Sequence, residues 1–375
     1  MYSRLVLGFL VFSVAQQLFA QAPESLESTL NEEIIEIPSG WSKLKTTVMR
    51  PDGAGPFPLI VMNHGKAFGN PYFQSRSRFL TLSSEMVRMG YAVILPNRKG
   101  VAGSGGTYIG SEGGGACAMT WMGKAQAEDI AATIEFAIKL PYIDISKIVV
   151  VGQSHGGMAA LAFAAQPAVP GVRAVVNFAG GNKSPDCLGW ENNMRNAFGE
   201  WGKTATYPTL WFYGENDSFF PPPVYRPAHT AYVAHGAKAD LVEFGVFAAG
   251  DAHAMIGQSQ GVPIWLPRIR TFFRSLGLPS EATYIKSEEA IPAESGFAQS
   301  SDVEAVPSLS SQGKENYRKY LAFPGGKAFV LTPSGRHWWA FGGADPVWRA
   351  LTNCRKEISD GCALYAVNER VVWSK

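Results

Sequence analysis

Short apolar segments alternate with helix-like segments through the middle of the chain, and this alternation restricts the fold more than any other feature. The apolar segments are rich in Val, Ile and Leu and end at turn residues, as buried strands do. They are Pro58–Met62, Ala92–Pro96, Ile148–Gly152, Val172–Phe178, Pro208–Tyr213 and Ala239–Phe247. The helix-like segments are Arg76–Met89, Ala125–Leu140, Gly157–Ala165, Val224–His235 and Val262–Leu276. This order predicts an α/β fold, with a mainly parallel sheet covered by helices on both faces.

The alternation occupies residues 41–277, which we expect to form one domain. Residues 278–311 are rich in Ser, Ala, Glu and Pro without periodicity, which predicts a linker. Residues 312–375 predict a small C-terminal α+β module of unknown role. Its expected elements are a hairpin of Lys327–Leu331 and His337–Phe341, a helix at Pro346–Lys356 and a strand at Ala363–Trp373.

The first residues are typical of an export signal. Arg4 supplies a positive charge, an apolar run follows at Leu5–Ala15, and small residues allow cleavage near Ala20–Ala22. A membrane anchor or a buried helix is the alternative, but the apolar run is too short to span a bilayer. We therefore expect a signal peptide over residues 1–22, a periplasmic or secreted protein, and no stable membrane span in the mature form.

Composition narrows the class of partner. The chain has 375 residues, 46% of them hydrophobic, which is enough for a large core. Its net charge is +2, and its Lys and Arg residues are scattered rather than clustered. Nothing in this distribution favours nucleic acid as a partner, so none is expected.

One motif follows an apolar segment at the point where a parallel sheet binds ligands, the carboxyl end of a strand. Gly152-Gln153-Ser154-His155-Gly156 stands between a strand and a helix. This arrangement is typical of a nucleophile elbow, in which the serine occupies a strained turn and side chains at Gly152 and Gly156 would clash. The helix N-terminus and the backbone N–H of His155 favour negative charge beside Ser154. A structural serine in a tight turn is the alternative.

A serine nucleophile needs a base and an acid, and both follow an elbow serine along the chain. His253 comes after the last apolar segment and is the predicted base. Asp217 comes after the segment that ends at Tyr213 and is the predicted acid, which fixes the imidazole tautomer. Glu215 and Asp251 are competing acids, although Asp251 is expected to shape the loop around His253.

The segment Asn63-His64-Gly65-Lys66 directly follows the first apolar segment. A loop at this place supplies the second backbone N–H of an oxyanion hole, and we assign it to the amide of Lys66. His64 is also a candidate metal ligand or second base. We expect it instead to hold the loop by hydrogen bonds.

Together with Pro96-Asn97-Arg98-Lys99-Gly100 and Ser104-Gly105-Gly106, these residues form an ordered set that resembles the dienelactone hydrolase-like and prolyl-oligopeptidase-like branch of the α/β-hydrolases. The resemblance covers residues 41–277 and implies a catalytic domain. Two departures concern the substrate. Dienelactone hydrolases carry a cysteine nucleophile where this chain has Ser154, and prolyl oligopeptidases carry a large propeller for which too few residues precede the domain.

The expected reaction is hydrolysis of a carboxylic ester through an acyl-enzyme on Ser154, with a small-molecule ester as substrate and no metal or organic cofactor. Two alternatives stay open. One is a serine peptidase or amidase, and the other is an envelope-binding protein with a vestigial hydrolase site. Aromatic residues that are candidates either for an acyl pocket or for plain packing are Trp121, Trp190, Trp201, Phe219 and Phe220.

Four cysteines in an exported chain suggest disulfides, and three pairings are open on sequence alone. Cys354 and Cys362 lie close together in the small module, so we expect them to pair. Cys117 and Cys187 lie in loops that leave the carboxyl ends of strands, and we expect this second pair to join the two loops. Buried free thiols are the alternative.

Overall fold

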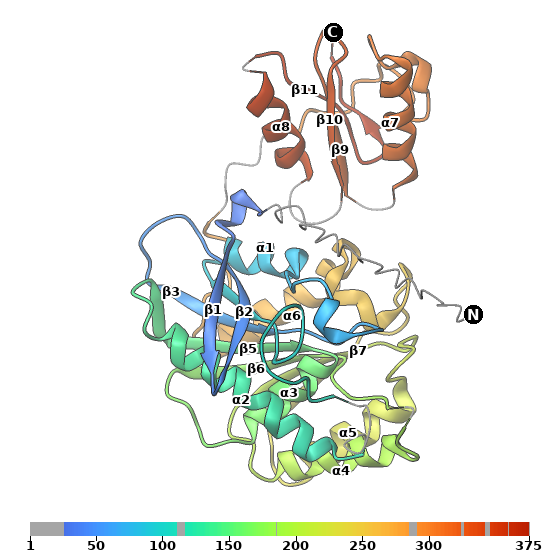
Figure 1. Ribbon diagram of the computed structural model, residues 1–375. Helices are drawn as coiled ribbons and strands as arrows, with labels where there is room; N and C mark the ends of the chain where they lie inside the picture. The colour runs from blue at the N-terminus through green and yellow to red at the C-terminus, as the bar shows by residue number, and fades with distance from the viewer. Residues whose placement is uncertain are drawn as a thin grey trace, which may run out of the picture.

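The computed structural model describes residues 26–110, 117–184, 186–284, 291–323, 326–341, 346–358 and 360–374 (Figure 1). The expected signal peptide, residues 1–22, lies outside these ranges. In the described residues, no helix combines the length and the apolar composition needed to cross a membrane.

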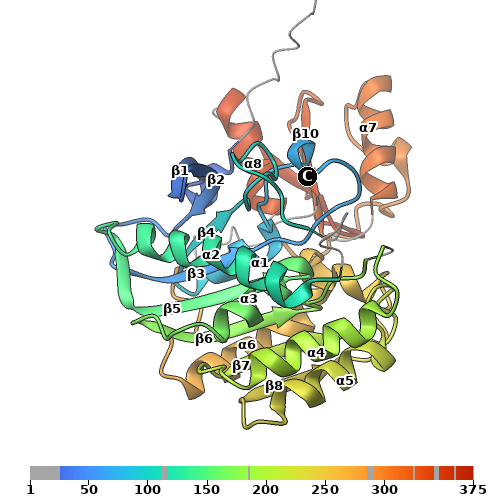
Figure 2. The same cartoon turned by 60° about the horizontal axis from the view of Figure 1, so that its bottom comes forward.

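A central sheet of eight strands organises the larger part of the described chain (Figures 1 and 2). Its order is β1-β2-β4-β3-β5-β6-β7-β8. The β1–β2 and β2–β4 pairs are antiparallel, and the other neighbours are parallel. The strands are β1 (Glu33–Ser39), β2 (Ser42–Met49), β3 (Phe57–Asn63), β4 (Ala92–Pro96), β5 (Ile143–Gln153), β6 (Val172–Phe178), β7 (Thr209–Tyr213) and β8 (Ala239–Glu243).

Helices cover both faces of this sheet, as Figures 1 and 2 show from two directions. One face packs against α1 (Leu80–Arg88) and α6 (Val262–Ser275). The other face packs against α2 (Met119–Ala137), α3 (His155–Ala164), α4 (Trp190–Gly202) and α5 (Pro222–Val233). Short 3-10 helices are η1 (Ser28–Leu30), η2 (Pro71–Phe73), η4 (Ala252–Gly257), η5 (Ser259–Gly261) and η6 (Val303–Ala305).

The two faces arise from the alternation of side chains along each strand. In β3, Leu59 and Val61 enter the core under α2 to α5, whereas Ile60 and Met62 enter the core under α1 and α6. Because both faces are buried, the central strands are continuously apolar. The predicted α/β fold with a mainly parallel sheet is confirmed.

The sequence prediction omitted three elements of this part of the chain. The hairpin of β1 and β2 is rich in charged residues and threonine, and the buried Thr47 hydroxyl is satisfied by donating to the carbonyl of Ser77 at 2.8 Å. Helix α4 contains poor helix formers such as Asn and Gly. Its buried residues nevertheless have helical spacing: Met194, Ala197, Phe198 and Trp201.

The C-terminal part forms a second sheet, with the order β10-β9-β11-β12 and antiparallel pairs throughout (Figure 1). Helix α8 packs with one small apolar cluster of the module, and α7 packs with another. The expected strand Ala363–Trp373 is instead two strands, because Asn368 adopts a left-handed conformation (φ 53°) and turns the chain. The elements are α7 (Ser311–Ala322), β9 (Lys327–Leu331), β10 (His337–Phe341), α8 (Pro346–Glu357), β11 (Ala363–Val367) and β12 (Arg370–Val371).

Residues of the expected linker, 278–311, contact helix α1 of the larger part and strand β12 of the C-terminal module. At one end, the amides of Thr283 and Tyr284 donate to the carbonyl of Arg88, both at 2.9 Å. At the other end, the amide of Ser295 donates to the carbonyl of Val371 at 3.0 Å, and Val306 is buried beside α7. These are single anchors in irregular backbone, so they leave no periodic pattern in the sequence.

All four cysteines are paired. Cys354 bonds to Cys362 within the C-terminal module, and Cys117 bonds to Cys187, as predicted. The second bond joins the segment before α2 to the segment before α4. Both segments lie at the carboxyl edge of the central sheet.

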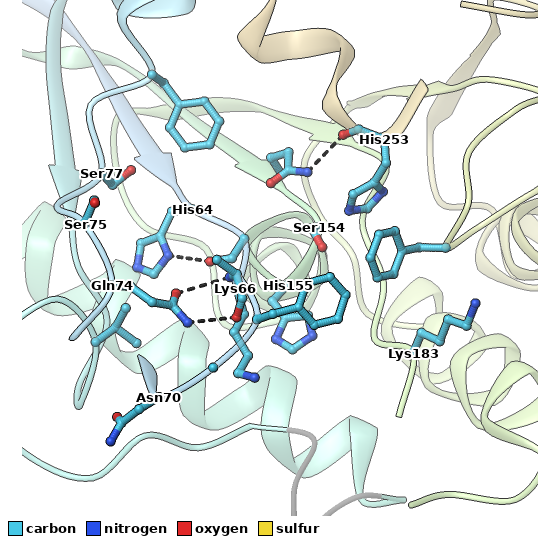
Figure 3. A pocket seen from close by; sticks show the side chains of 18 of the residues that line it. His64, Lys66, Asn70, Gln74, Ser75, Ser77, Ser154, His155, Lys183 and His253 are labelled. Atoms are coloured by element: carbon cyan, nitrogen blue, oxygen red, sulfur yellow. Dashed lines mark hydrogen bonds between the residues drawn. The ribbon is translucent and has the colours of Figure 1, made fainter. Parts of the chain in front are cut away.

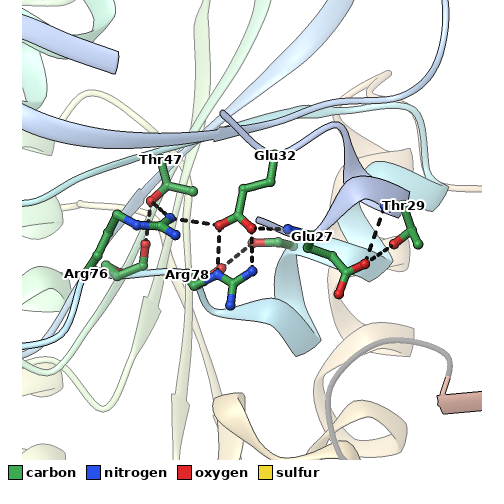
Figure 4. Close-up of polar contacts among 8 residues, drawn as sticks. Glu27, Thr29, Glu32, Thr47, Arg76 and Arg78 are labelled. Carbon is green, nitrogen blue, oxygen red and sulfur yellow. Dashed lines mark hydrogen bonds and ion pairs between the residues drawn. The ribbon is translucent and has the colours of Figure 1, made fainter. Parts of the chain in front are cut away.

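A buried charge cluster fixes the segment before α1 (Figure 4). The Glu32 carboxylate, fully buried, accepts from Arg76 Nη1 at 2.8 Å and from Arg78 Nε at 2.7 Å. Arg76 also donates to Thr47 Oγ1 at 2.6 Å. Burial raises the pKa of Glu32, but the hydrogen bonds from Arg78 and Arg76 outweigh it, and the net pKa lies below the ordinary 4.5.

Replacing Glu32 by Gln removes the carboxylate that pairs with the buried Arg76. We expect the free energy of unfolding to fall by about 3–5 kcal/mol at pH 7. Because the pKa of Glu32 is lowered by folding, its stabilisation is complete above 4.5 and is lost as the pH falls through the folded value. Thermal melts of both proteins from pH 7 to pH 3 should therefore converge in acid. A constant gap would contradict the assignment.

The apolar clusters of the two sheets share no residue, which predicts that residues 26–284 fold without the C-terminal module. A chain ending at Tyr284 should keep the unfolding midpoint of the α/β part in calorimetry. A chain ending at Gly277 is the matched control, because it also loses the buried Leu278 and the bonds to Arg88, and it should melt earlier. A misfolded chain ending at Tyr284 would disprove the separation.

Candidate active site

Ser154 occupies the sharp turn between β5 and α3, with φ 55° and ψ −122°. This positive φ is costly for a residue other than glycine. The turn also brings backbone segments very close together. A Cβ on Gly152 would lie 2.1 Å from the carbonyl oxygen of Gly156, and one on Gly156 would lie 2.0 Å from that of Asn63. Both positions therefore require glycine.

Asp217 and His253 form a hydrogen-bonded pair beside this turn. Asp217 follows β7, and His253 lies in η4, beyond β8. The distance from His253 Nδ1 to Asp217 Oδ2 is 3.1 Å. Asp217 Oδ1 accepts the amides of Phe219 and Phe220 at 2.8 and 2.9 Å. These bonds fix a fully buried carboxylate against the imidazole.

The two competing acids have other surroundings. Glu215 is exposed. Asp251 accepts the amide of His253 at 2.9 Å and the hydroxyl of Ser218 at 2.5 Å, so it shapes the loop, as expected. Burial raises the pKa of Asp251. The hydrogen bonds from Ser218 and His253 lower it by a larger amount, so the net pKa lies below the ordinary value. The His253 ring itself is bonded to Asp217.

Gln153, the residue before Ser154, makes a contact that the sequence did not predict. Its Nε2 donates to the carbonyl of His253 at 3.1 Å, which ties the elbow to the histidine loop. The motif contained this residue, but nothing in the sequence indicated which backbone group its amide would reach.

The loop after β3 lies against the elbow. A Cβ on Gly65 would stand 3.0 Å from the Cβ of Ser154. His64 is buried, and both of its ring nitrogens are bonded: Nε2 accepts the amide of Arg98 at 3.1 Å, and Nδ1 lies 2.6 Å from the carbonyl oxygen of Gly65. A neutral imidazole with its proton on Nδ1 satisfies both bonds. The prediction that His64 holds this loop is confirmed.

His155 follows Ser154, is buried and lines the cleft. Its Nδ1 is 3.1 Å from the hydroxyl of Tyr108. Burial, and then the positive charges of Arg98 and Lys66, lower the pKa of His155 to about 3. The side chain is therefore neutral at physiological pH.

A cleft of about 1080 Å³ opens over these residues. In Figure 3, Ser154 and His253 lie on one side of the cavity, and Ser75 and Ser77 lie on the other. The charged lining residues are Lys66, Arg78 and Lys183. None of the described residues that line the cleft is Asp or Glu. In the same described ranges, no three His, Cys, Asp or Glu side chains gather into a set that could hold a metal ion.

Aromatic rings form much of the cleft wall. Phe68 and Phe73 line it and are largely exposed, at 90% and 80%. Phe219 covers the His253 ring at 4.5 Å between centroids and lies 6.3 Å from Phe68. Of the aromatic residues singled out in the sequence, Phe219 and Phe220 line the cleft, whereas Trp201 packs in the core.

Known proteins are similar to this chain over part of its length. The chain matches a family model described as X-Pro dipeptidyl-peptidase (S15 family) over residues 39–207, a range that contains Ser154 but ends before Asp217. The human acylamino-acid-releasing enzyme is 28% identical over 100 residues, which are 27% of this chain and only 12% of that enzyme.

Solved structures are similar at low sequence identity. The uncomplexed acylaminoacyl peptidase of Pyrococcus horikoshii has a TM-score of 0.50 at 16% identity, covering 70% of this chain and 44% of that one. A putative dienelactone hydrolase from Klebsiella pneumoniae subsp. pneumoniae has a TM-score of 0.46 at 17% identity, covering 65% of this chain and 98% of that one.

The mainly parallel sheet, the elbow at the end of β5 and these similarities lead to one assignment. The chain belongs to the α/β-hydrolase superfamily, with a serine at the position of the nucleophile.

Proposed function

We propose that this chain hydrolyses carboxylic esters with Ser154 as nucleophile, His253 as base and Asp217 as orienting acid. One observation carries the proposal. The buried Asp217 carboxylate bonds to His253 Nδ1 at 3.1 Å, and His253 and the elbow serine line the same cleft. A base held by a carboxylate next to a strained serine is the arrangement that activates a hydroxyl for acyl transfer.

In the first half-reaction, Ser154 Oγ attacks the ester carbonyl carbon while its proton passes to His253 Nε2. Asp217 accepts the hydrogen bond from Nδ1–H and stabilises the imidazolium. The backbone amides of His155 and Lys66 donate to the oxyanion. The tetrahedral intermediate then breaks its bond to the alcohol oxygen, which takes the proton from Nε2.

In the second half-reaction, water attacks the acyl-enzyme. His253 Nε2 accepts a proton from the water, and the oxyanion returns to the same two amides. Collapse breaks the bond between the acyl carbon and Ser154 Oγ, which recovers the proton. The carboxylic acid leaves, and the free enzyme is restored.

A serine peptidase is the second candidate, because the family model is described as an X-Pro dipeptidyl-peptidase and the human relative is named an acylamino-acid-releasing enzyme. The charges of the residues that line the cleft favour esters over dipeptides with a free amino terminus. A free α-ammonium needs an anionic partner, and the described lining residues offer cations such as Lys66 and Lys183 instead. Esters and N-blocked substrates carry no such ammonium group.

We also propose export. Two disulfides are typical of proteins from oxidising compartments, which supports a periplasmic or secreted protein. Cleavage within residues 1–22 stays a prediction, which the N-terminal sequence of the mature protein would test.

The function is tested with p-nitrophenyl esters of increasing chain length beside aminoacyl and N-acetyl-aminoacyl p-nitroanilides. We expect the esters to be preferred in kcat/KM. Ser154→Ala should lower kcat by several orders of magnitude and leave only catalysis from the oxyanion hole. Ser146→Ala, at a serine on the opposite edge of the sheet, is the matched control and should keep full activity. Preference for anilides would overturn the ester proposal, and an active Ser154→Ala protein would overturn the nucleophile.

Asp217→Asn should leave the fold intact and reduce kcat by about 10⁴, because the amide no longer holds the required tautomer of His253. Glu215→Asn should be silent, since Glu215 is exposed. Asp251→Asn should have an intermediate effect through the loop. Steady-state kinetics of the three variants rank them, and near-normal turnover of Asp217→Asn would refute its role.

A further inference from the structure

Arg98 is a buried cation that the reaction described above does not use. It follows β4 and is 3% exposed. In the described part of the chain, no Asp or Glu lies within ion-pair distance of its guanidinium, although Asp129, which pairs with Lys99, is close enough to raise the pKa of Arg98. The Arg98 Nε is buried without a hydrogen-bond partner. Burying a charge without a carboxylate partner is unfavourable. The contacts that Arg98 does make are therefore informative.

Apart from a hydrogen bond with Tyr108, those contacts converge on one short segment. The Arg98 guanidinium donates to the carbonyl of His64 and, at 3.2 Å, to the carbonyl of Gly65. The backbone amide of Arg98 donates to His64 Nε2 at 3.1 Å. His64 Nδ1 in turn lies 2.6 Å from the same Gly65 oxygen. Two donors thus hold this oxygen on the Arg98 side of the loop.

The peptide that carries this oxygen also carries the Lys66 N–H. Gly55–Pro56 is the cis bond in the described chain, so the Gly65–Lys66 peptide is trans. In a trans peptide the N–H and the C=O point in opposite directions. Since the carbonyl faces Arg98, the Lys66 N–H faces away from it. Gly65 itself lies against Ser154, where an added Cβ would be 3.0 Å from the serine Cβ.

We infer that Arg98 is a positioning residue for the oxyanion hole: its guanidinium clamps the His64 and Gly65 carbonyls and thereby aims the Lys66 amide at the tetrahedral intermediate formed on Ser154. The inference rests on the proposed function and adds a residue to it. A hydrogen bond to the Gly65 carbonyl also polarises the peptide, which makes its N–H a stronger donor to an anion.

The positive charge of Arg98 also favours the anionic tetrahedral intermediate. Burial, and then the nearby Arg98 charge, lower the pKa of His64 well below its ordinary value. Burial and Arg98 lower the pKa of His155 as well. The two histidines around Ser154 therefore stay neutral, and the positive charge beneath the loop favours the anionic intermediate over the neutral ester. Its benefit should appear in the transition state and not in substrate binding.

The test exchanges Arg98 for Lys, which keeps the charge but replaces the planar fork of the guanidinium by a single ammonium group. Loss of a direct oxyanion donor costs about 10²–10³ in kcat, so misdirecting one donor should cost about 10–100-fold. KM for p-nitrophenyl esters should stay within about twofold, because the ground state does not use the hole. The affinity for an arylboronic acid, which forms a tetrahedral anion on the serine, should fall in parallel with kcat/KM.

Arg173→Lys is the control, because it makes the same exchange at an arginine that also donates to a backbone carbonyl, that of Leu276 at 3.1 Å, and neither residue lines the cleft. It should leave kcat and boronate affinity unchanged. His64→Ala removes the other donor to the Gly65 oxygen and should reproduce the loss of kcat at constant KM. This second variant decides the question if Arg98→Lys fails to fold.

A folded Arg98→Lys protein with normal kcat and normal boronate affinity overturns the inference, as does a His64→Ala protein with normal kcat. A different result, an active Ser154→Ala protein, would overturn the proposed function. A lower melting temperature with unchanged kinetics would reduce Arg98 to a structural anchor and would also overturn the inference.

Discussion

The close approach of two backbone turns beneath Ser154 is the constraint on which the rest of the site depends. Strands β3 and β5 are parallel neighbours, with Asn63 in register with Gly152, so the loop after β3 and the elbow after β5 meet at one edge of the sheet. Their contact is so tight that a Cβ on Gly156 would lie 2.0 Å from the Asn63 carbonyl oxygen. The sheet itself therefore brings Ser154 and the loop after β3 together.

Buried charges hold the segments that the sheet leaves free. Glu32 forms ion pairs with Arg76 and Arg78. These pairs fix the segment that runs from the cleft wall into α1. Arg98 binds the carbonyls of His64 and Gly65 in the loop after β3. Asp217 is held by two amides and aligns His253. In each case, hydrogen bonds offset part of the cost of burying a charge and hold a loop in place.

The sequence was most informative where a residue follows an apolar strand. Ser154, Asp217 and His253 each stand in such a position, and strand order alone predicted that they share an edge. Side-chain chemistry was less informative for contacts with backbone carbonyls. Nothing local indicates that Arg98 reaches Gly65 or that Gln153 reaches His253, because both contacts depend on how two loops fold against each other. The sequence did not predict the β1–β2 hairpin for a related reason. Its threonines are polar residues, and they can be buried only because their hydroxyls donate to backbone carbonyls.

The central claim is that chemistry passes through an acyl group on Ser154. Its most direct test is an acid quench of the enzyme during turnover of p-nitrophenyl acetate, followed by peptide mass mapping. The account predicts one acetyl group on the peptide that contains Ser154, accumulating with a burst of p-nitrophenol and disappearing when substrate is exhausted. Turnover with no acylated peptide, or with the acetyl group on another residue, would contradict it.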